Sequence, residues 1–191
     1  MALAELMQKM SGGGDYADTK NFWCKKGGEV IRNPVEYLVE DLDSIPFPDY
    51  SFEDHYIPDE GMNRLIRMDL SLVEKQAHRE VDLGGRIGYG TSFSRGCQYH
   101  FTFCHTFKGI YREKKYVRIR SIQNLIAELE AAKERFNFIG AIVLFDYNLF
   151  FQPLHIIREF SELCREKINL PRAPLFTVGA FSMVCYHQVH P

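Results

Sequence analysis

The sequence predicts an α/β protein, and the order of its apolar segments carries that prediction. From residue 86 onward, short apolar runs that suit buried strands alternate with segments whose apolar residues recur at helical spacing. A strand, helix, strand, helix, strand order requires a parallel sheet with right-handed crossovers. With 191 residues, 46% of them apolar, the chain is long enough to build a packed core.

The first half of the chain predicts small elements joined by turns. Residues 1–10 predict a short helix, and Asn21–Arg32 predicts a hairpin because two β-prone pieces flank a Lys-Gly-Gly turn. The stretch 41–50 carries two prolines and three acids, which predicts an extended linker. The segment 51–85 has a mixed pattern, and we expect one helix in it around Asn63–Ala77.

The second half predicts the alternating elements of the sheet. We expect a first strand over Ile87–Ser94, directly before a cysteine-containing loop. Ser121 is suited to cap a first helix, and the continuous apolar run Ala141–Phe145 predicts a strand buried on both faces. Pro153 suits the first turn of a second helix, and Leu175–Val178 predicts a third strand.

The composition excludes several classes of protein. A net charge of −2, with 23 basic and 25 acidic residues, provides no basic surface for nucleic acid or an anionic membrane. The sequence holds neither an apolar run long enough to span a membrane nor a secretory signal. Five scattered cysteines suit reduced thiols better than a disulfide framework. We therefore expect a cytoplasmic protein that binds neither nucleic acid nor membranes.

The cysteine loop Ser94–Cys104 has the pattern of a cluster-binding loop with one ligand replaced. Three thiolates at C-x3-C-x2-C spacing can hold three irons of a four-iron, four-sulfur cube and leave the fourth iron open. Cys97 and Cys104 occupy the first and third positions, and Phe101, which cannot ligate iron, occupies the second.

Several features in the same order resemble the radical S-adenosylmethionine superfamily, in particular its cobalamin-associated branch. Together they cover residues 20 to 180 roughly, and it is their order that makes the set specific. They are the hairpin with Trp23, Arg32-Asn33-Pro34, the linker Glu40–Pro48, Ser94-Arg95-Gly96-Cys97, Phe103-Cys104, Tyr116–Ser121 and Phe145-Asp146-Tyr147-Asn148.

The resemblance implies a fold, cofactors and site residues. It implies a partial (β/α)6 barrel whose first loop holds a 4Fe-4S cluster through Cys97 and Cys104. The open iron binds S-adenosylmethionine, and reductive cleavage yields a 5′-deoxyadenosyl radical. By position, the backbone of Phe103 would lie near the adenine, and Asp146 or Asn148 would face the methionyl group.

Other metal arrangements remain open for the loop. His100, beside Phe101, is a candidate replacement ligand, because imidazole ligates iron in Rieske centres, although adjacent residues in an extended loop point apart. A tetrahedral zinc site is a second alternative, although the spacing fits no common zinc module. Its donors would be Cys97, His100, Cys104 and His105.

The resemblance also predicts how the chain is divided. Residues 1–50 resemble the tail of a cobalamin-binding-type domain plus a linker, 51–85 a connecting segment, and 86–191 the N-terminal half of the barrel, with about three strands. The Asp-x-His-x-x-Gly cobalamin motif is absent, so we expect no cobalamin binding by this chain alone. We expect another chain or a missing segment to complete the barrel.

Two hypotheses for function follow. The first is a radical S-adenosylmethionine-type enzyme segment acting on a small molecule that the sequence does not identify. The second is a catalytically inactive, truncated remnant that serves as a binding or scaffold module.

Overall fold

The computed structural model forms two compact units, one built on residues up to Glu40 and on Tyr116, the other on Asp41–Cys97 and on the chain from Val117 onward. Residues 41–50 belong to the second unit. The structure describes residues 2–36, 38–59, 61, 63–80, 86–97, 116–146, 149, 152–168 and 175–177.

The first unit contains a helix followed by a hairpin. Helix α1 spans Ala2–Ser11, and strands β1 (Trp23–Lys26) and β2 (Glu29–Arg32) pair antiparallel. Gly27 and Gly28 connect the strands with φ of 59° and 88°, the left-handed backbone that a two-residue hairpin turn needs. The expected N-terminal helix and hairpin are therefore both confirmed.

A single amide side chain organises the connection between α1 and the hairpin. Asn33 Nδ2 donates to the backbone oxygens of Ala17, Thr19 and Phe22 at 2.7, 3.0 and 3.0 Å. Ala17 and Thr19 are buried, so their carbonyls need a partner from the protein itself. Asn33 thus closes the loop that leads into β1.

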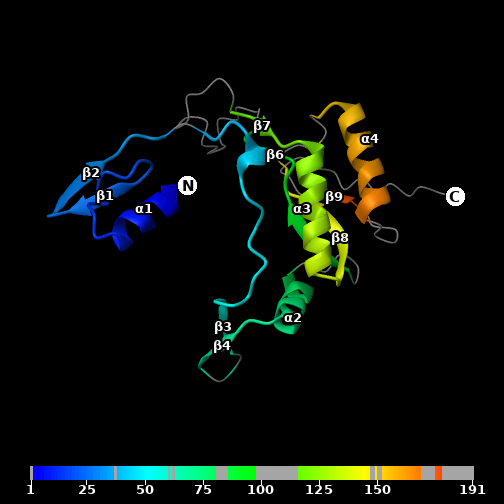
Figure 1. Cartoon of the computed structure of the whole chain (residues 1–191), viewed down its shortest axis with the longest axis horizontal. Coiled ribbons are helices and arrows are strands. Elements are labelled where there is room, and N and C mark those ends of the chain that lie inside the picture. The colour runs from blue at the N-terminus through cyan, green and yellow to red at the C-terminus, as the bar shows by residue number, and fades with distance from the viewer. Residues whose placement is uncertain are drawn as a thin grey trace. The chain divides into compact units, whose positions relative to one another are not determined.

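The second unit is built on a parallel sheet. Strands β5 (Ile87–Thr91), β8 (Ile139–Leu144) and β9 (Leu175–Thr177) lie in the order β5-β8-β9, and both pairings are parallel (Figure 1). This confirms the α/β class. The described residues form this sheet and three two-stranded sheets, with no closed barrel among them.

Two helical segments connect the three strands. Helix α3 (Ile122–Arg135) begins at Ser121, whose side chain accepts from the backbone N–H of Asn124 at 3.0 Å, as the sequence predicts. Helix α4 (Leu154–Leu163) continues into a π-helical turn at Cys164–Ile168. Pro153 takes the N-cap position of α4 rather than its first turn.

The core lies between these helices and the sheet. It consists of apolar side chains from β8, α3, α4 and the chain that follows β5. Its buried members are Phe93, Ile122, Leu125, Ile126, Leu129, Ile142, Leu144, Leu149, Phe160 and Ile168.

The expected linker at 41–50 is packed against α3. It contains a short 3-10 helix, η1 (Leu42–Ser44), followed by extended chain. At the start of α3, Asp43 Oδ1 accepts from the Ser121 N–H at 2.9 Å. At the end of the helix, Arg135 Nε donates to the backbone oxygen of Tyr50 at 3.1 Å. Residues 43–50 therefore follow the length of the helix.

The segment 51–80 differs from the sequence prediction. Strands β3 (Tyr56–Pro58) and β4 (Leu65–Arg67) form a hairpin, and helix α2 begins only at Leu70, spanning Leu70–Glu80. The expected helix around Asn63–Ala77 is thus wrong in its first part. The physical reason is local: Asn63 has φ of 52°, and Asp69 Oδ1 accepts from the Leu72 N–H at 2.9 Å, which starts the helix there.

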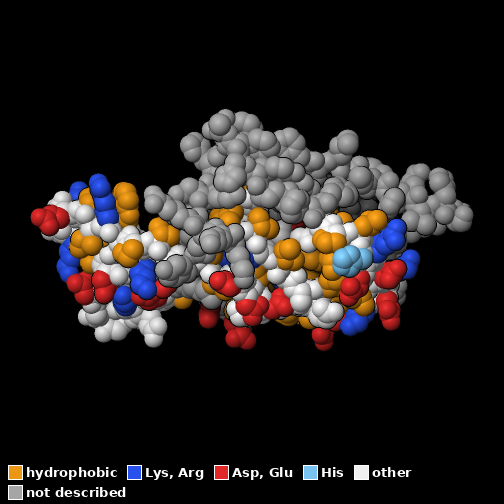
Figure 2. All heavy atoms as spheres, turned by 90° about the horizontal axis from the view of Figure 1, so that it is seen from above, with side chains coloured by type: hydrophobic (Ala, Val, Ile, Leu, Met, Phe, Trp, Pro, Cys, Tyr) orange, Lys and Arg blue, Asp and Glu red, His pale blue; other side chains and the backbone are white. Residues whose placement is uncertain are grey.

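The surface carries both signs of charge. Figure 2 shows both basic and acidic side chains on the face that it displays. Within the part of the chain that the structure describes, no helix combines the length and the apolarity needed to cross a bilayer.

Candidate functional site

The candidate site lies where the chain leaves the first strand of the parallel sheet. After β5, Phe93 inserts into the core, where it is 1% exposed and meets Phe160 edge-to-face at 5.4 Å between ring centroids. The two-residue strand β6 (Ser94–Arg95) follows, then Gly96 with φ of 96° and the buried Cys97. The first cysteine of the predicted loop therefore follows the carboxyl end of β5.

A second short strand meets β6 from the other side of the loop. Strand β7 (Arg118–Ile119) pairs antiparallel with β6, with Ser94 opposite Ile119 and Arg95 opposite Arg118. The Arg120 N–H also donates to the Phe93 oxygen at 3.0 Å. This β6–β7 clamp brings together two points of the chain that the intervening segment separates in sequence.

Asp146 lies two residues after the end of β8, at the same edge of the sheet, as the sequence predicts. Its side chain is buried at 1% exposure, and both carboxylate oxygens are engaged. Oδ2 accepts from the Phe93 N–H at 2.9 Å, and Oδ1 accepts from the Ser94 N–H at 2.6 Å and the Ser94 hydroxyl at 2.5 Å. The structure therefore brings Asp146 together with the base of the Cys97 loop.

Two of the predicted site residues belong to the part of the chain that the structure describes. Of the candidates named from the sequence, only Cys97 and Asp146 belong to the described residues. Those that lie outside them are His100, Phe101, Phe103, Cys104, His105 and Asn148.

The described residues do not by themselves provide a metal centre. Cys97, Cys24 and Cys164 are free thiols, and no three His, Cys, Asp or Glu side chains of the described chain gather as a metal would need. Burial raises the pKa of Cys164 to about 12, so this thiol is a poor ligand and nucleophile. A cube needs several thiolates, and the donor that the described residues place at the candidate site is Cys97 alone.

Sequence reasoning missed a buried polar network that joins β5 to α3. Arg120 Nη1 lies 2.6 Å from Glu128 Oε2, and both side chains are nearly buried. The Tyr89 hydroxyl donates to Glu128 Oε1 at 2.9 Å and shares a 2.5 Å hydrogen bond with the Tyr50 hydroxyl. Burial raises the pKa of Tyr89 far above its usual value, and the hydrogen bond to Tyr50 and the nearby Glu128 carboxylate raise it further.

One signal in the sequence pointed to this network. Glu128 stands three residues after Leu125 and one before Leu129, within the apolar stripe of the helix. A carboxylate on a buried helix face needs a cationic or hydrogen-bonding partner, because an unpaired buried charge is costly.

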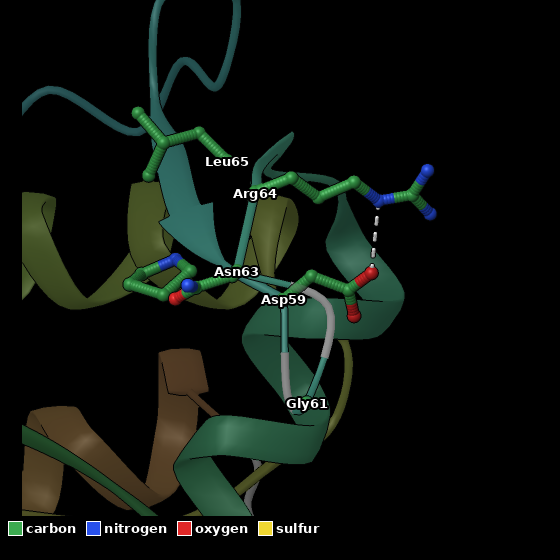
Figure 3. Close-up of a pocket in the computed structure, with 6 residues that line it drawn as sticks. Asp59, Gly61, Asn63, Arg64 and Leu65 are labelled. Atoms are coloured by element: carbon green, nitrogen blue, oxygen red, sulfur yellow. Dashed lines mark hydrogen bonds and ion pairs between the residues drawn. The ribbon is translucent and has the colours of Figure 1, made fainter.

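The structure also has a surface hollow at the β3–β4 turn. It has a volume of about 470 Å³, and Figure 3 shows the ion pair between Arg64 Nε and Asp59 Oδ2, 3.1 Å apart, at its rim. No residue predicted from the sequence lines it. The lining residues are Pro58, Asp59, Gly61, Asn63, Arg64 and Leu65.

Comparison of the chain with protein families, with curated proteins and with solved structures finds no match.

Proposed function

We propose that this chain is a radical S-adenosylmethionine-type iron–sulfur protein segment whose cofactor loop begins at Cys97. The observation that carries the proposal is the position of this buried thiol after the carboxyl end of β5. In barrels of parallel strands, active sites lie at the carboxyl ends of the strands. The β6–β7 clamp gives the loop that follows Cys97 a defined base at this edge.

The order of the sheet supports the finer proposal that the fold is a segment of a partial (β/α)6 barrel. Neighbours in the sheet follow the order of the chain, β5-β8-β9. A barrel adds its strands in this sequential way, whereas doubly wound folds reverse the order at a switch point. In the proposal, another chain or a missing segment supplies the later strands.

In this proposal the predicted site residues other than Asp146 keep the roles that the resemblance implies. Cys97 and Cys104 ligate a 4Fe-4S cluster with His100 as the replacement donor, and Phe103 and Asn148 help to seat S-adenosylmethionine. When bound, the cluster supplies the electron for reductive cleavage of the sulfonium. Cobalamin is not bound by this chain alone.

A second candidate function is a catalytically inactive remnant that acts as a binding or scaffold module. The observation that favours it is the donor set: the described residues place one thiol at the site, and Phe101 occupies the middle ligand position. An open parallel sheet also has edges, and strand edges pair readily with other chains.

Anaerobic reconstitution with iron and sulfide separates the two candidates. We expect the enzyme-type protein to hold a near-stoichiometric cluster whose electron paramagnetic resonance spectrum changes when S-adenosylmethionine is added. The variant Phe101→Cys should raise iron loading and Cys97→Ser should abolish it, while Cys24→Ser, a thiol of the other unit, should change nothing. A Phe101→Cys variant that stays colourless would refute a latent cluster site and favour the scaffold.

A further inference from the structure

We propose that Asp146 is a positioning residue that holds the base of the Cys97 loop, and that it is not a ligand for a small molecule. The proposal rests on the proposed function only in taking Cys97 as the functional thiol.

The hydrogen bonds of Asp146 engage both oxygens of its carboxylate. Three donors from two consecutive residues, Phe93 and Ser94, share its two oxygens at distances between 2.5 and 2.9 Å. Bonds from N–H and O–H groups to an ionised carboxylate are short and about twice as strong as neutral ones. At 1% exposure, Asp146 has little surface through which a ligand could reach it.

These hydrogen bonds supply acceptors for the backbone N–H groups of Phe93 and Ser94. Phe93 and Ser94 lie between the end of β5 and the β6–β7 clamp, and the burial of Phe93 keeps its N–H away from water. A buried backbone N–H needs an acceptor. Turning the carboxylate toward a ligand would leave both N–H groups without one.

Few residues separate the Asp146 hydrogen bonds from the Cys97 thiol, and their backbone is held in place. Ser94 is three residues before Cys97, and its backbone is held at once by Asp146 and by pairing with Ile119. Gly96 then turns the chain with φ of 96°, a conformation that only glycine adopts readily. Loss of the Asp146 hydrogen bonds should therefore expose Cys97 before it disturbs the rest of the unit.

The test is the alkylation rate of each thiol in the full-length protein, read separately by peptide mass spectrometry with iodoacetamide. In Asp146→Asn we expect the rate at Cys97 to rise about tenfold or more, equivalent to about 1.4 kcal/mol of easier local opening. Cys164, a half-buried thiol of the same unit, and Cys24, in the other unit, should keep their rates. No cluster is needed, so a failed reconstitution leaves this result interpretable.

Two further variants provide a weaker perturbation of the same site and a control at another site. Ser94→Ala removes one of the three donors, so it should raise the Cys97 rate by a smaller factor in a protein that still folds. Asp69→Asn is the matched control, because Asp69 also accepts from a backbone N–H and a serine hydroxyl, at the start of α2. The proposal is overturned if the Cys97 rate is unchanged in Asp146→Asn and Ser94→Ala, or if it rises in step with the Cys164 rate.

Discussion

Replacing Glu128 by Gln tests whether the buried network stabilises the second unit. The change keeps an oxygen that can accept from Tyr89 and removes the charge that faces Arg120, so it isolates the ion pair. The paired side chains are 12% and 6% exposed and 2.6 Å apart. Breaking a buried pair by removing one partner costs about 3–5 kcal/mol.

Part of that cost is offset, because Arg120 keeps a second acceptor. Its Nε donates to Asn124 Oδ1 at 2.8 Å. We therefore expect Glu128→Gln to lower the free energy of unfolding by about 2–3 kcal/mol, or Tm by roughly 10 °C. Adding Arg120→Met removes the unpaired charge and should restore about 1 kcal/mol or more.

Urea and thermal unfolding measure these changes, with Arg64→Gln as the control. Arg64 forms an ion pair with Asp59 in the same unit, but its side chain is 63% exposed, so its loss should cost less than about 1 kcal/mol. A Glu128→Gln cost no greater than that of Arg64→Gln would refute the reasoning, as would a double variant less stable than the single one.

Three further predictions follow from single residues. Asn33→Ala should destabilise the first unit by about 1–3 kcal/mol, because it removes the donor to three carbonyls; limited proteolysis within residues 15–22 would detect the loosened loop. Gly96→Ala should cost about 1–2 kcal/mol in chemical denaturation, because its φ of 96° strains any residue with a Cβ. For Cys164, burial raises the folded-state pKa from its usual 9.0 to about 12, so the unfolded chain loses its proton first and stability falls as pH rises above 9. Unfolding measured at roughly pH 8 and roughly pH 11 should show a smaller alkaline loss in Cys164→Ala than in the parent protein, and an equal loss would contradict this assignment.

The sequence predicted those elements whose signals are local. Helix α3 has a serine cap and a regular apolar stripe, and β8 is a continuous apolar run, so each was expected close to its observed bounds. The β3–β4 hairpin was not expected, because its strands have three residues each and no alternating pattern. Its turn depends on the positive φ of Asn63, a backbone state that composition alone does not specify.

The candidate site shows the same division between local and long-range information. A polar residue directly after an apolar strand predicts a position at the sheet edge, and Asp146 has that position. Which donors would face its carboxylate depends on Phe93 and Ser94, more than fifty residues earlier in the chain. Likewise, Tyr89 and Glu128 are separated by 39 residues, so only the folded structure brings them together.

The β6–β7 clamp also makes the chain modular at this point. Because four residues, Ser94–Arg95 and Arg118–Ile119, hold the two sides together, we expect the sheet to tolerate changes in the length of what is inserted between them. Doubling the length of a flexible insertion costs only about 0.6 kcal/mol in closure entropy. New binding chemistry can therefore be exchanged there, by evolution or by grafting, while β5, β8 and α3 remain as a fixed frame.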